Sequence, residues 1–266
     1  MKDGIGRRNL KTALATGGLV NGWCSIPSTV TAEIMARQGF DTITVDLQHG
    51  LIDYQTALAM LQVIDGRDAP TLCRVPWNEP GIIMKALDAG FTGIICPMVN
   101  TRAEADRFVG ACRYAPSGYR SFGPTRALNV YGADYVKAAH GFITTIAMIE
   151  TAEALDNLDD ILGVEGLDAV YIGPADLSLS LGFTPTLMPE EPEVLDAIER
   201  IRDRTRQAGK AAGIHCGSAS GVCDRLGGGF NFATLVTDAR LFTATLQAQL
   251  AEARRSKPAE NGAGQY

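Results

Sequence analysis

Eight short apolar runs recur along the 266-residue chain, and stretches with helical periodicity separate them. Most of the runs lack the apolar–polar alternation of a half-exposed strand, as expected for parallel strands that are covered on both faces. Strands that alternate with helices predict repeated βαβ units, and eight such units close as a single-domain α/β barrel of the (β/α)8, or TIM-barrel, class. The predicted strands span residues 19–23, 42–46, 71–75, 93–97, 143–149, 169–172, 212–216 and 232–236.

Helical signals fill the intervals between these runs. Residues 54–64 place four apolar side chains along one helical face. Thr101 and Glu104 form the capping-box pattern that begins another helix. Such signals between strands support the barrel.

Two long segments interrupt the rhythm of strands and helices, at residues 113–141 and 182–192. Long loops on a barrel are often functional, so both are predicted to shape the substrate pocket. We expect the catalytic barrel to span residues 1–255 and residues 256–266 to form a disordered tail.

The overall charge and the cysteines limit the possible partners and surroundings. A formal net charge of −6 argues against a nucleic-acid or membrane-surface partner. No apolar run approaches the ~20 residues that a membrane helix needs. The six cysteines contain no C-x-x-C pair, and four of them, at 24, 73, 96 and 216, lie in or directly after predicted strands, so buried free thiols are favoured over disulfides or a zinc site. We therefore expect a cytoplasmic protein.

The C-terminal ends of the strands are where a (β/α)8 barrel builds its active site. Here these ends carry residue types suited to catalysis on several neighbouring strands. They are Trp23, Asp46 to His49, Arg74, Pro97, Glu150 and residues 173–176. The sequence therefore predicts one reactive pocket at this end of the barrel.

Two carboxylates follow consecutive strands. Glu150 ends the fifth strand, and Asp176 comes shortly after the sixth. A lone carboxylate after an apolar strand is more often a helix N-cap. Facing one pocket, they offer hard oxygen ligands without cysteine or clustered histidine, a set that selects Mg²⁺ or Mn²⁺.

A cation and two backbone amides complete the expected pocket. Arg74 ends an apolar strand, where it either forms a structural salt bridge or holds a carbonyl oxygen that becomes an enolate oxygen. Gly173, Pro174 and Ala175 begin a short helix. The amides of Ala175 and Asp176 can face an anion there, whereas Pro174 has no N–H, and the tripeptide also suits a plain turn.

His49 is the histidine that we expect to act. Asp46 stands three residues before it and is expected to hydrogen-bond the imidazole and raise its basicity. His140 falls in the first long segment and His215 in the seventh strand, so both are expected to be structural. A Schiff-base aldolase needs a lysine at a strand end, but Lys210 precedes its strand, and a metal route is preferred.

Five short motifs, taken together and in the order in which they occur along the chain, resemble the HpcH/HpaI aldolase family of class II 2-oxo acid aldolases. That family contains 4-hydroxy-2-oxoheptanedioate and 2-dehydro-3-deoxyglucarate aldolases. The resemblance covers residues 18–250, and the set is specific although each motif alone is weak. The motifs are DLQHG at 46–50, RVPWN at 74–78, CPMV at 96–99, IET at 149–151 and GPADLS at 173–178.

The resemblance implies a divalent metal, Mg²⁺ or Mn²⁺ with Co²⁺ as a further candidate, held by Glu150 and Asp176. It implies that the amides of Ala175 and Asp176 hold the carboxylate of pyruvate, and that Arg74 binds its keto oxygen. The substrates would be a small 2-oxo acid and an aldehyde, joined or separated through an enolate.

Other positions acquire roles through the same resemblance. His49, paired with Asp46, would be the acid/base, and Trp23 would line the pocket. Asp88 matches a position that enters a neighbouring subunit's site, and family members are usually hexamers built as trimers of dimers.

One position departs from the family pattern. Gln48 stands where the family often has glutamate, and the lost charge bears on how the metal's water is held or on the choice of substrate. Two other hypotheses remain open: a citramalyl-CoA or malyl-CoA type lyase, and a non-catalytic 2-oxo acid binding protein. The first would need a basic groove for the CoA phosphates, and the candidate arginines at 200, 202, 204 and 206 have the spacing of a solvated helix face.

Overall fold

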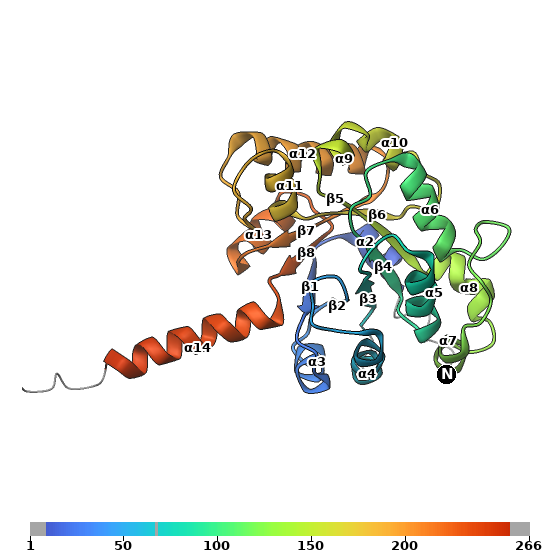
Figure 1. The fold of residues 1–266 in the computed structure, drawn as a ribbon, viewed down its shortest axis with the longest axis horizontal. Helices are drawn as coiled ribbons and strands as arrows, with labels where there is room; N and C mark the ends of the chain where they lie inside the picture. Colours follow the sequence, from blue (N-terminus) through green and yellow to red (C-terminus); the bar gives the residue numbers. More distant parts are fainter. Residues whose placement is uncertain (1–8, 67–68, 256–266) are drawn as a thin grey trace, which may run out of the picture.

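All eight predicted strands form in the computed structural model, which describes residues 9–66 and 69–255. Each strand pairs in parallel with the next, and β8 pairs with β1, so the sheet closes into a barrel as predicted (Figure 1). The observed ends differ from the predicted ones by at most one residue. The strands are β1 (Leu19–Cys24), β2 (Thr42–Asp46), β3 (Thr71–Arg74), β4 (Gly93–Cys96), β5 (Thr144–Ile149), β6 (Ala169–Ile172), β7 (Ala211–Cys216) and β8 (Phe232–Leu235).

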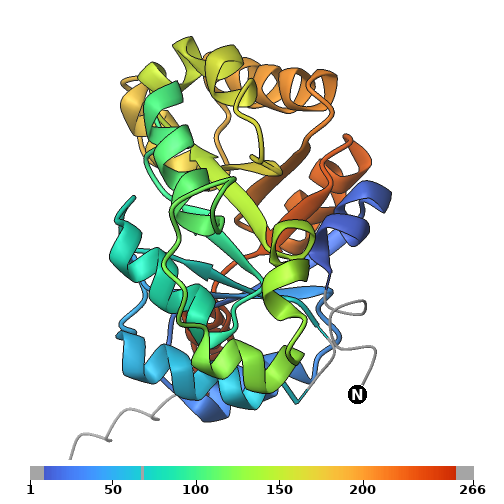
Figure 2. The same cartoon turned by 90° about the vertical axis from the view of Figure 1, so that its right-hand side faces the viewer.

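Helices surround the strands on the outside (Figure 2). The helix predicted at residues 54–64 forms with those bounds, and the predicted capping box of Thr101 and Glu104 is confirmed. The helices are α2 (Leu10–Thr16), α3 (Thr29–Ala36), α4 (Tyr54–Ile64), α5 (Pro80–Ala89), α6 (Arg102–Cys112), α7 (Thr125–Tyr131), α8 (Tyr135–Phe142), α9 (Ala152–Asp156), α10 (Leu158–Leu162), α11 (Pro174–Ser180), α12 (Pro192–Gln207), α13 (Ala219–Gly227) and α14 (Asp238–Arg255).

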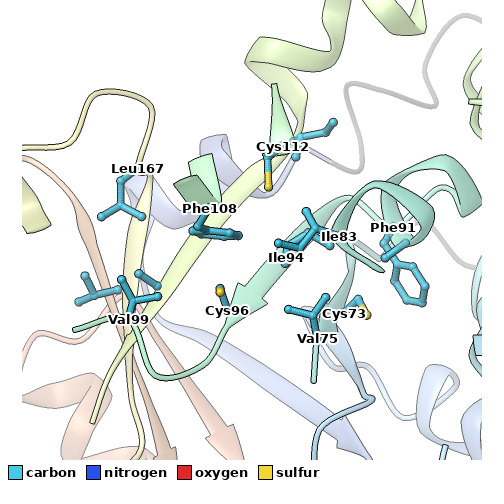
Figure 3. Close-up of a cluster of buried hydrophobic side chains, with 14 of the residues drawn as sticks. Cys73, Val75, Ile83, Phe91, Ile94, Cys96, Val99, Phe108, Cys112 and Leu167 are labelled. Carbon is cyan, nitrogen blue, oxygen red and sulfur yellow. The ribbon is translucent and has the colours of Figure 1, made fainter. Parts of the chain in front are cut away.

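The layer between helices and strands holds the main hydrophobic core and most of the cysteines. Cys73, Cys96 and Cys112 lie among apolar side chains there (Figure 3). Burial raises the pKa of Cys112 to about 12, so this thiol stays protonated. The prediction of buried free thiols is confirmed for five cysteines, whereas Cys223 is exposed.

A second apolar cluster fills the barrel interior and is closed at its N-terminal end by α2. Leu10 and Leu14 of α2 pack with residues that line the inside of the strands. Phe232 fills the interior because β7 has glycine beside it: a Cβ on Gly213 would lie 2.2 Å from the Phe232 ring. The interior is therefore solid below the end where the catalytic residues were expected.

The segment 113–141 lies at the opposite end of the barrel from that site, so the prediction that it shapes the pocket is wrong for the pocket of its own chain. It forms α7 and α8, and Arg113 bonds to the carbonyl oxygens of Ile143 and Gly166 and to Asp168, around the starts of β5 and β6. The physical reason is topological. An insertion between a helix and the following strand emerges at the N-terminal face of a barrel, away from the catalytic face.

The other end of the chain was predicted to form a disordered tail. Residues 256–266 lie outside the described residues. Within the described part, no helix combines the length and the apolar character needed to cross a bilayer.

Candidate active site

A cavity of about 280 Å³ opens at the C-terminal ends of the strands. Of the predicted site residues, Trp23, Asp46, His49, Arg74, Gly173, Ala175 and Asp176 line it. Seven other residues complete its wall: Ser25, Met148, Tyr171, Leu187, His215, Thr237 and Arg240. The rule that a barrel's active site forms at the C-terminal ends of its strands therefore identified the correct face of the molecule.

Arg74 and Asp46 form a buried ion pair at the floor of this cavity. Arg74 Nε and Nη2 donate to the two oxygens of Asp46, at 2.8 and 2.6 Å. Trp23 supports both residues: its Nε1 donates to Asp46 at 3.2 Å, and its ring lies 4.8 Å from the Arg74 guanidinium carbon. The salt bridge predicted as one alternative for Arg74 is present, and the guanidinium that it fixes still lines the cavity.

Asp46 is committed to Arg74, and the expected bond to the His49 imidazole is not formed. Burial acts to raise the pKa of Asp46, but hydrogen bonds and charge from Arg74, with help from Trp23 and the Gln48 amide, outweigh it and lower the pKa. Asp46 Oδ1 also accepts the backbone N–H of His49 at 3.3 Å. The imidazole has no hydrogen-bond partner among the described residues and lies exposed at the cavity rim. Asp46 therefore positions the loop that carries His49 and leaves the ring free.

Glu150 lies just beneath the cavity wall. It is buried, and its Oε1 accepts the N–H of Met98 at 2.9 Å. Met98 adopts a left-handed backbone with φ of 53°, which is uncommon for a residue other than glycine and clusters at functional sites. A Cβ on Gly173 would meet Glu150 Oε2 at 2.4 Å, so glycine there leaves this oxygen room. Met98 belongs to the motif at 96–99, but its contact with Glu150 was not predicted, and no sequence signal marks its backbone conformation.

Glu150 and Asp176 form a carboxylate pair beside the cavity. Burial, with a smaller contribution from the negative charge of Asp176, raises the pKa of Glu150 to about 7 against the lowering effects of the Met98 amide and of Arg74. Two carboxylates close enough to repel, one buried and one exposed at the cavity, fit a hard divalent cation as their partner. No third acidic, histidine or cysteine ligand joins them within the described residues. The donor set thus suits a metal whose remaining positions are filled by water and substrate.

Gly173 and Ala175 bring the start of α11 to the cavity. Gly173 is the N-cap of this helix and lies against Glu150 Oε2, and the first turn carries Asp176. Pro174 lines an adjoining cavity of about 410 Å³ instead. That second cavity shares Leu187 and His215 with the first, and Leu187 belongs to the segment 182–192, which therefore borders the site as predicted.

Gln48 and Asp88 do not line the catalytic cavity. The Oε1 of Gln48 is buried and has no hydrogen-bond partner within the described chain. Asp88 lies near the end of α5 and accepts from Arg120 Nη2 at 2.7 Å. For Asp88 the prediction concerned a neighbouring subunit, so its placement outside this chain's own cavity leaves that prediction standing.

His215 lies near the end of β7, Thr237 follows β8, and Arg240 lies in the first turn of α14. His215 was expected to be structural, and it is mostly buried and bonded to Tyr171, but it also faces the cavity. The strand-end rule identifies these positions as well when it is extended to the seventh and eighth strands.

The basic groups weighed for other chemistries have other partners. Lys210 donates to the carbonyl oxygens of Val164 and Leu167 at the start of β7, which confirms that it stands at the wrong end for a Schiff base. Arg204 pairs with Asp159, and Arg202 with Asp203, on the surface of α12. Arg202 also lines the adjoining cavity, and its side chain is only 16% exposed. The ion pairs engage these two α12 arginines, so neither is a free cation for a CoA phosphate.

Comparison with known proteins agrees with the geometry of the site. Residues 22–243 match the family model described as HpcH/HpaI aldolase/citrate lyase. The chain is 45% identical to a hydroxypyruvate/pyruvate aldolase of Rhizorhabdus wittichii over 233 residues, covering 88% of this chain and 93% of the relative. It is 39% identical to a 4-hydroxy-2-oxo-heptane-1,7-dioate aldolase of Shigella flexneri over 210 residues, covering 77% and 78% of the two chains.

The fold gives the same relationship. A crystal structure of an HpcH/HpaI aldolase/citrate lyase family protein from Burkholderia cenocepacia J2315 matches with a TM-score of 0.87 and 28% identity, covering 93% of this chain and 99% of the other. An intact pocket on this fold and relatives that are aldolases set aside the hypothesis of a non-catalytic binding protein. The chain belongs to the HpcH/HpaI aldolase/citrate lyase family and is a carbon–carbon lyase of the aldolase type.

Proposed function

We propose that this lyase forms and cleaves 4-hydroxy-2-oxo acids through the enolate of pyruvate or hydroxypyruvate, with an aldehyde as the second substrate. The observation that carries the proposal is the meeting of a fixed guanidinium and a carboxylate pair at one cavity. Arg74 cannot swing away because Asp46 holds two of its nitrogens. A fixed cation of this kind stabilises an oxygen on which negative charge develops. The names of the two relatives point to the same class of substrates.

The residues proposed to hold the divalent metal are Glu150 and Asp176. Their oxygen ligands favour Mg²⁺ or Mn²⁺, with Co²⁺ as a further candidate. When bound, such a cation supplies Lewis-acid polarisation of the keto oxygen of the 2-oxo acid. Gly173 supports this assignment, because its missing side chain leaves space at Glu150 Oε2.

The substrate carboxylate is assigned to the start of α11. The amides of Ala175 and Asp176 have no helical acceptors there, and backbone N–H groups at a helix start favour an anion. Trp23 forms an apolar wall beside Arg74, which keeps water from that side of the guanidinium. The carboxylate and keto oxygen of one substrate would then lie between α11 and Arg74.

His49 is the group proposed to move the proton. In the cleavage direction it accepts the proton of the 4-hydroxyl, the C3–C4 bond breaks, and the bonding electrons enter the enolate while the aldehyde leaves. Its ring is exposed at the rim and has no hydrogen-bond partner in the part of the chain that the structure describes, which suits a base that must reach substrate or a bridging water. Asp46 assists through Arg74 and through the His49 amide.

The active enzyme is further proposed to be a homo-oligomer, with a trimer of dimers as the arrangement that the family resemblance implies. Helix α14 extends away from its own barrel instead of covering it (Figure 1). Phe242, Leu246 and Leu250 recur every four residues along it and are 61%, 46% and 53% exposed. An apolar face of this kind on a projecting helix needs a partner, and a second copy supplies one. Asp88 would contribute to a neighbour's site in such an assembly.

Five cysteines buried as free thiols support a reducing compartment, and we place the enzyme in the cytoplasm. The acidic net charge of −6 supports the absence of nucleic-acid and membrane partners.

The decisive experiment follows exchange of the C3 protons of pyruvate in D₂O with and without Mg²⁺ or Mn²⁺. Enolate formation predicts metal-dependent exchange before any aldehyde is added. An aldehyde screen with both 2-oxo acids then identifies the second substrate. Exchange at the same rate after chelation would reject the metal assignment, and no exchange under any condition would reject the enolate.

A further inference from the structure

A chain of hydrogen bonds runs from the wall of the barrel to the catalytic cavity. It links Asn21 on β1, Thr234 on β8, Tyr171 on β6 and His215 on β7. Asn21, Thr234 and Tyr171 are fully buried. His215 stands at the cavity end of the chain.

The backbone fixes the direction of the first link. One side-chain atom of Asn21 lies 3.1 Å from the carbonyl oxygen of Thr42 and 3.2 Å from that of Gly22. Carbonyl oxygens only accept, so this atom is the amide nitrogen. The amide oxygen then lies 2.8 Å from Thr234 Oγ1, and Thr234 must donate to it.

Each hydroxyl has one proton to donate, so the direction of this hydrogen bond fixes the direction of the next two. Thr234 has given its proton to Asn21 and can only accept from Tyr171, at 2.6 Å. Burial raises the pKa of Tyr171 well above its ordinary value, so the phenol keeps its proton and donates it to Thr234. The Tyr171 oxygen can then only accept from Nδ1 of His215, at 3.1 Å. Nδ1 therefore carries the hydrogen of a neutral ring, and Nε2 is bare.

The surroundings of His215 keep it in this form. Burial, together with the positive charge of Arg74, lowers the pKa of His215 to about 3, while Asp46 opposes and Arg240 adds to the effect. The ring packs edge-on against Trp23 with centroids 5.0 Å apart. Its Nε2 has no hydrogen-bond partner within the described chain, although the ring borders both cavities.

We infer that His215 is a specificity-determining residue whose bare Nε2 accepts a hydrogen bond from a hydroxyl group of the substrate. The inference rests on the proposed function, which supplies the 2-oxo acid and the aldehyde. A fixed acceptor favours a ligand that brings an O–H, because the analogue without it leaves the nitrogen unpaired. The hydroxyl belongs either to the donor, as in hydroxypyruvate, or to the aldehyde, as in glycolaldehyde.

The kinetic test compares kcat/KM for substrate pairs that differ by one hydroxyl: hydroxypyruvate with pyruvate, and glycolaldehyde with acetaldehyde. His215→Phe keeps a ring but removes the acceptor, and it should lower one of these two ratios by roughly 3- to 10-fold, the value of a neutral hydrogen bond. His215→Gln can place an amide oxygen near the former Nε2 and should recover much of the lost preference. His140→Phe alters an exposed histidine on α8 and should leave both ratios as they are.

The ratio that falls identifies the substrate that carries the hydroxyl. Unchanged ratios in His215→Phe, with a wild-type enzyme that turns over both pairs, would overturn the inference alone. A wild-type enzyme that catalyses no reaction of a 2-oxo acid would remove the proposed function together with it.

A second measurement reads the tautomer without any substrate. Long-range ¹H–¹⁵N spectra of the protein, which has three histidines, should show His215 protonated at Nδ1 and bare at Nε2. In Thr234→Val, Tyr171 loses its acceptor and should donate to Nδ1, which moves the hydrogen to Nε2. A wild-type His215 protonated at Nε2 would overturn the inference.

Discussion

Asp46 and Arg74 are 28 positions apart in the sequence, yet two hydrogen bonds of 2.8 and 2.6 Å join them in the lining of the catalytic cavity. Their side chains are 2% and 10% exposed, so water screens the pair little. The pair therefore acts as one unit, in which the carboxylate sets the position of the cation.

Replacing Asp46 with asparagine should damage both activity and stability. Arg74 would keep its charge in a nearly buried site without a counter-ion, at a cost of about 3 kcal/mol in the free energy of unfolding. We expect kcat to fall on the order of 10²-fold because the guanidinium is no longer fixed. Urea unfolding and steady-state kinetics measure the two effects. Asp106→Asn, on the exposed surface of α6, is the control, and equal behaviour of the two variants would contradict the role given to Asp46.

Substitutions of Arg74 separate the effect of its positive charge from the effect of its forked contact with Asp46. Arg74→Ala should lower kcat on the order of 10²–10³-fold, as the loss of an oxyanion-stabilising group does. Arg74→Lys restores the charge but not the forked contact with Asp46, so it should recover a small part of that loss. An Arg74→Ala enzyme with undiminished turnover would reject the proposed enolate stabilisation.

The raised pKa of Glu150 predicts how the metal-free protein responds to pH. The carboxyl ionises near its ordinary value of 4.5 in the unfolded chain and near 7 in the folded one. Between these values the folded state binds the extra proton, so the free energy of unfolding falls as pH rises through this window, on the order of 3 kcal/mol in all. Chemical unfolding at pH 4.5–8 after chelation measures this loss.

Two comparisons isolate the contribution of Glu150 to that pH dependence. Glu150→Gln should flatten the decline, because glutamine does not titrate. Mn²⁺ should restore stability at pH 8 in the wild type, since it binds the ionised form. A wild-type protein with no decline after chelation would show that the buried carboxyl ionises normally.

Glycine at position 173 is predicted to be required for metal binding. An added Cβ would lie 2.4 Å from Glu150 Oε2, so Gly173→Ala must displace that carboxylate. We expect the Mn²⁺ concentration for half-maximal activity to rise roughly 10- to 100-fold, the range seen when groups that orient metal ligands are changed. Gly141→Ala is the matched control, because nothing lies within 4 Å of its new Cβ. Metal titration of activity distinguishes the two variants.

The exposed face of α14 predicts an assembly that depends on it. Phe242→Asp combined with Leu246→Asp should shift the protein to a smaller species in light scattering at the same concentration, because the apolar contact is replaced by charge. Gln249→Glu adds a charge to the same exposed helix without removing an apolar side chain. An unchanged mass for the double variant would exclude α14 from the interface.

Local patterns were sufficient for the barrel and for most of its catalytic end. Strand boundaries follow from short apolar runs, and the positions of Arg74, Glu150 and Asp176 follow from the rule that strand ends meet at one face. Burial of the strand cysteines follows in the same way. These features depend on residues that are neighbours in the sequence.

Local patterns did not predict which side chains from different strands contact one another. Asp46 was expected to bond the imidazole of His49, three residues away, but it binds Arg74 on the next strand instead. His215 is oriented by its hydrogen bond with Tyr171, which belongs to the neighbouring strand. Met98 adopts a left-handed backbone, and its N–H donates to Glu150. The residues next to Asp46, His215 and Met98 in the sequence give no signal of these contacts.

Apolar periodicity and strand order act along the chain, and they were enough to predict the (β/α)8 class, the strand limits and the side chains gathered at the catalytic end. The carboxylate that holds Arg74, the bare nitrogen of His215 and the face covered by the segment 113–141 became apparent in the folded protein alone. The physical reason is that hydrogen bonds and charges act through space over a few ångströms, and closure of the barrel sets those distances between residues that are far apart in the chain.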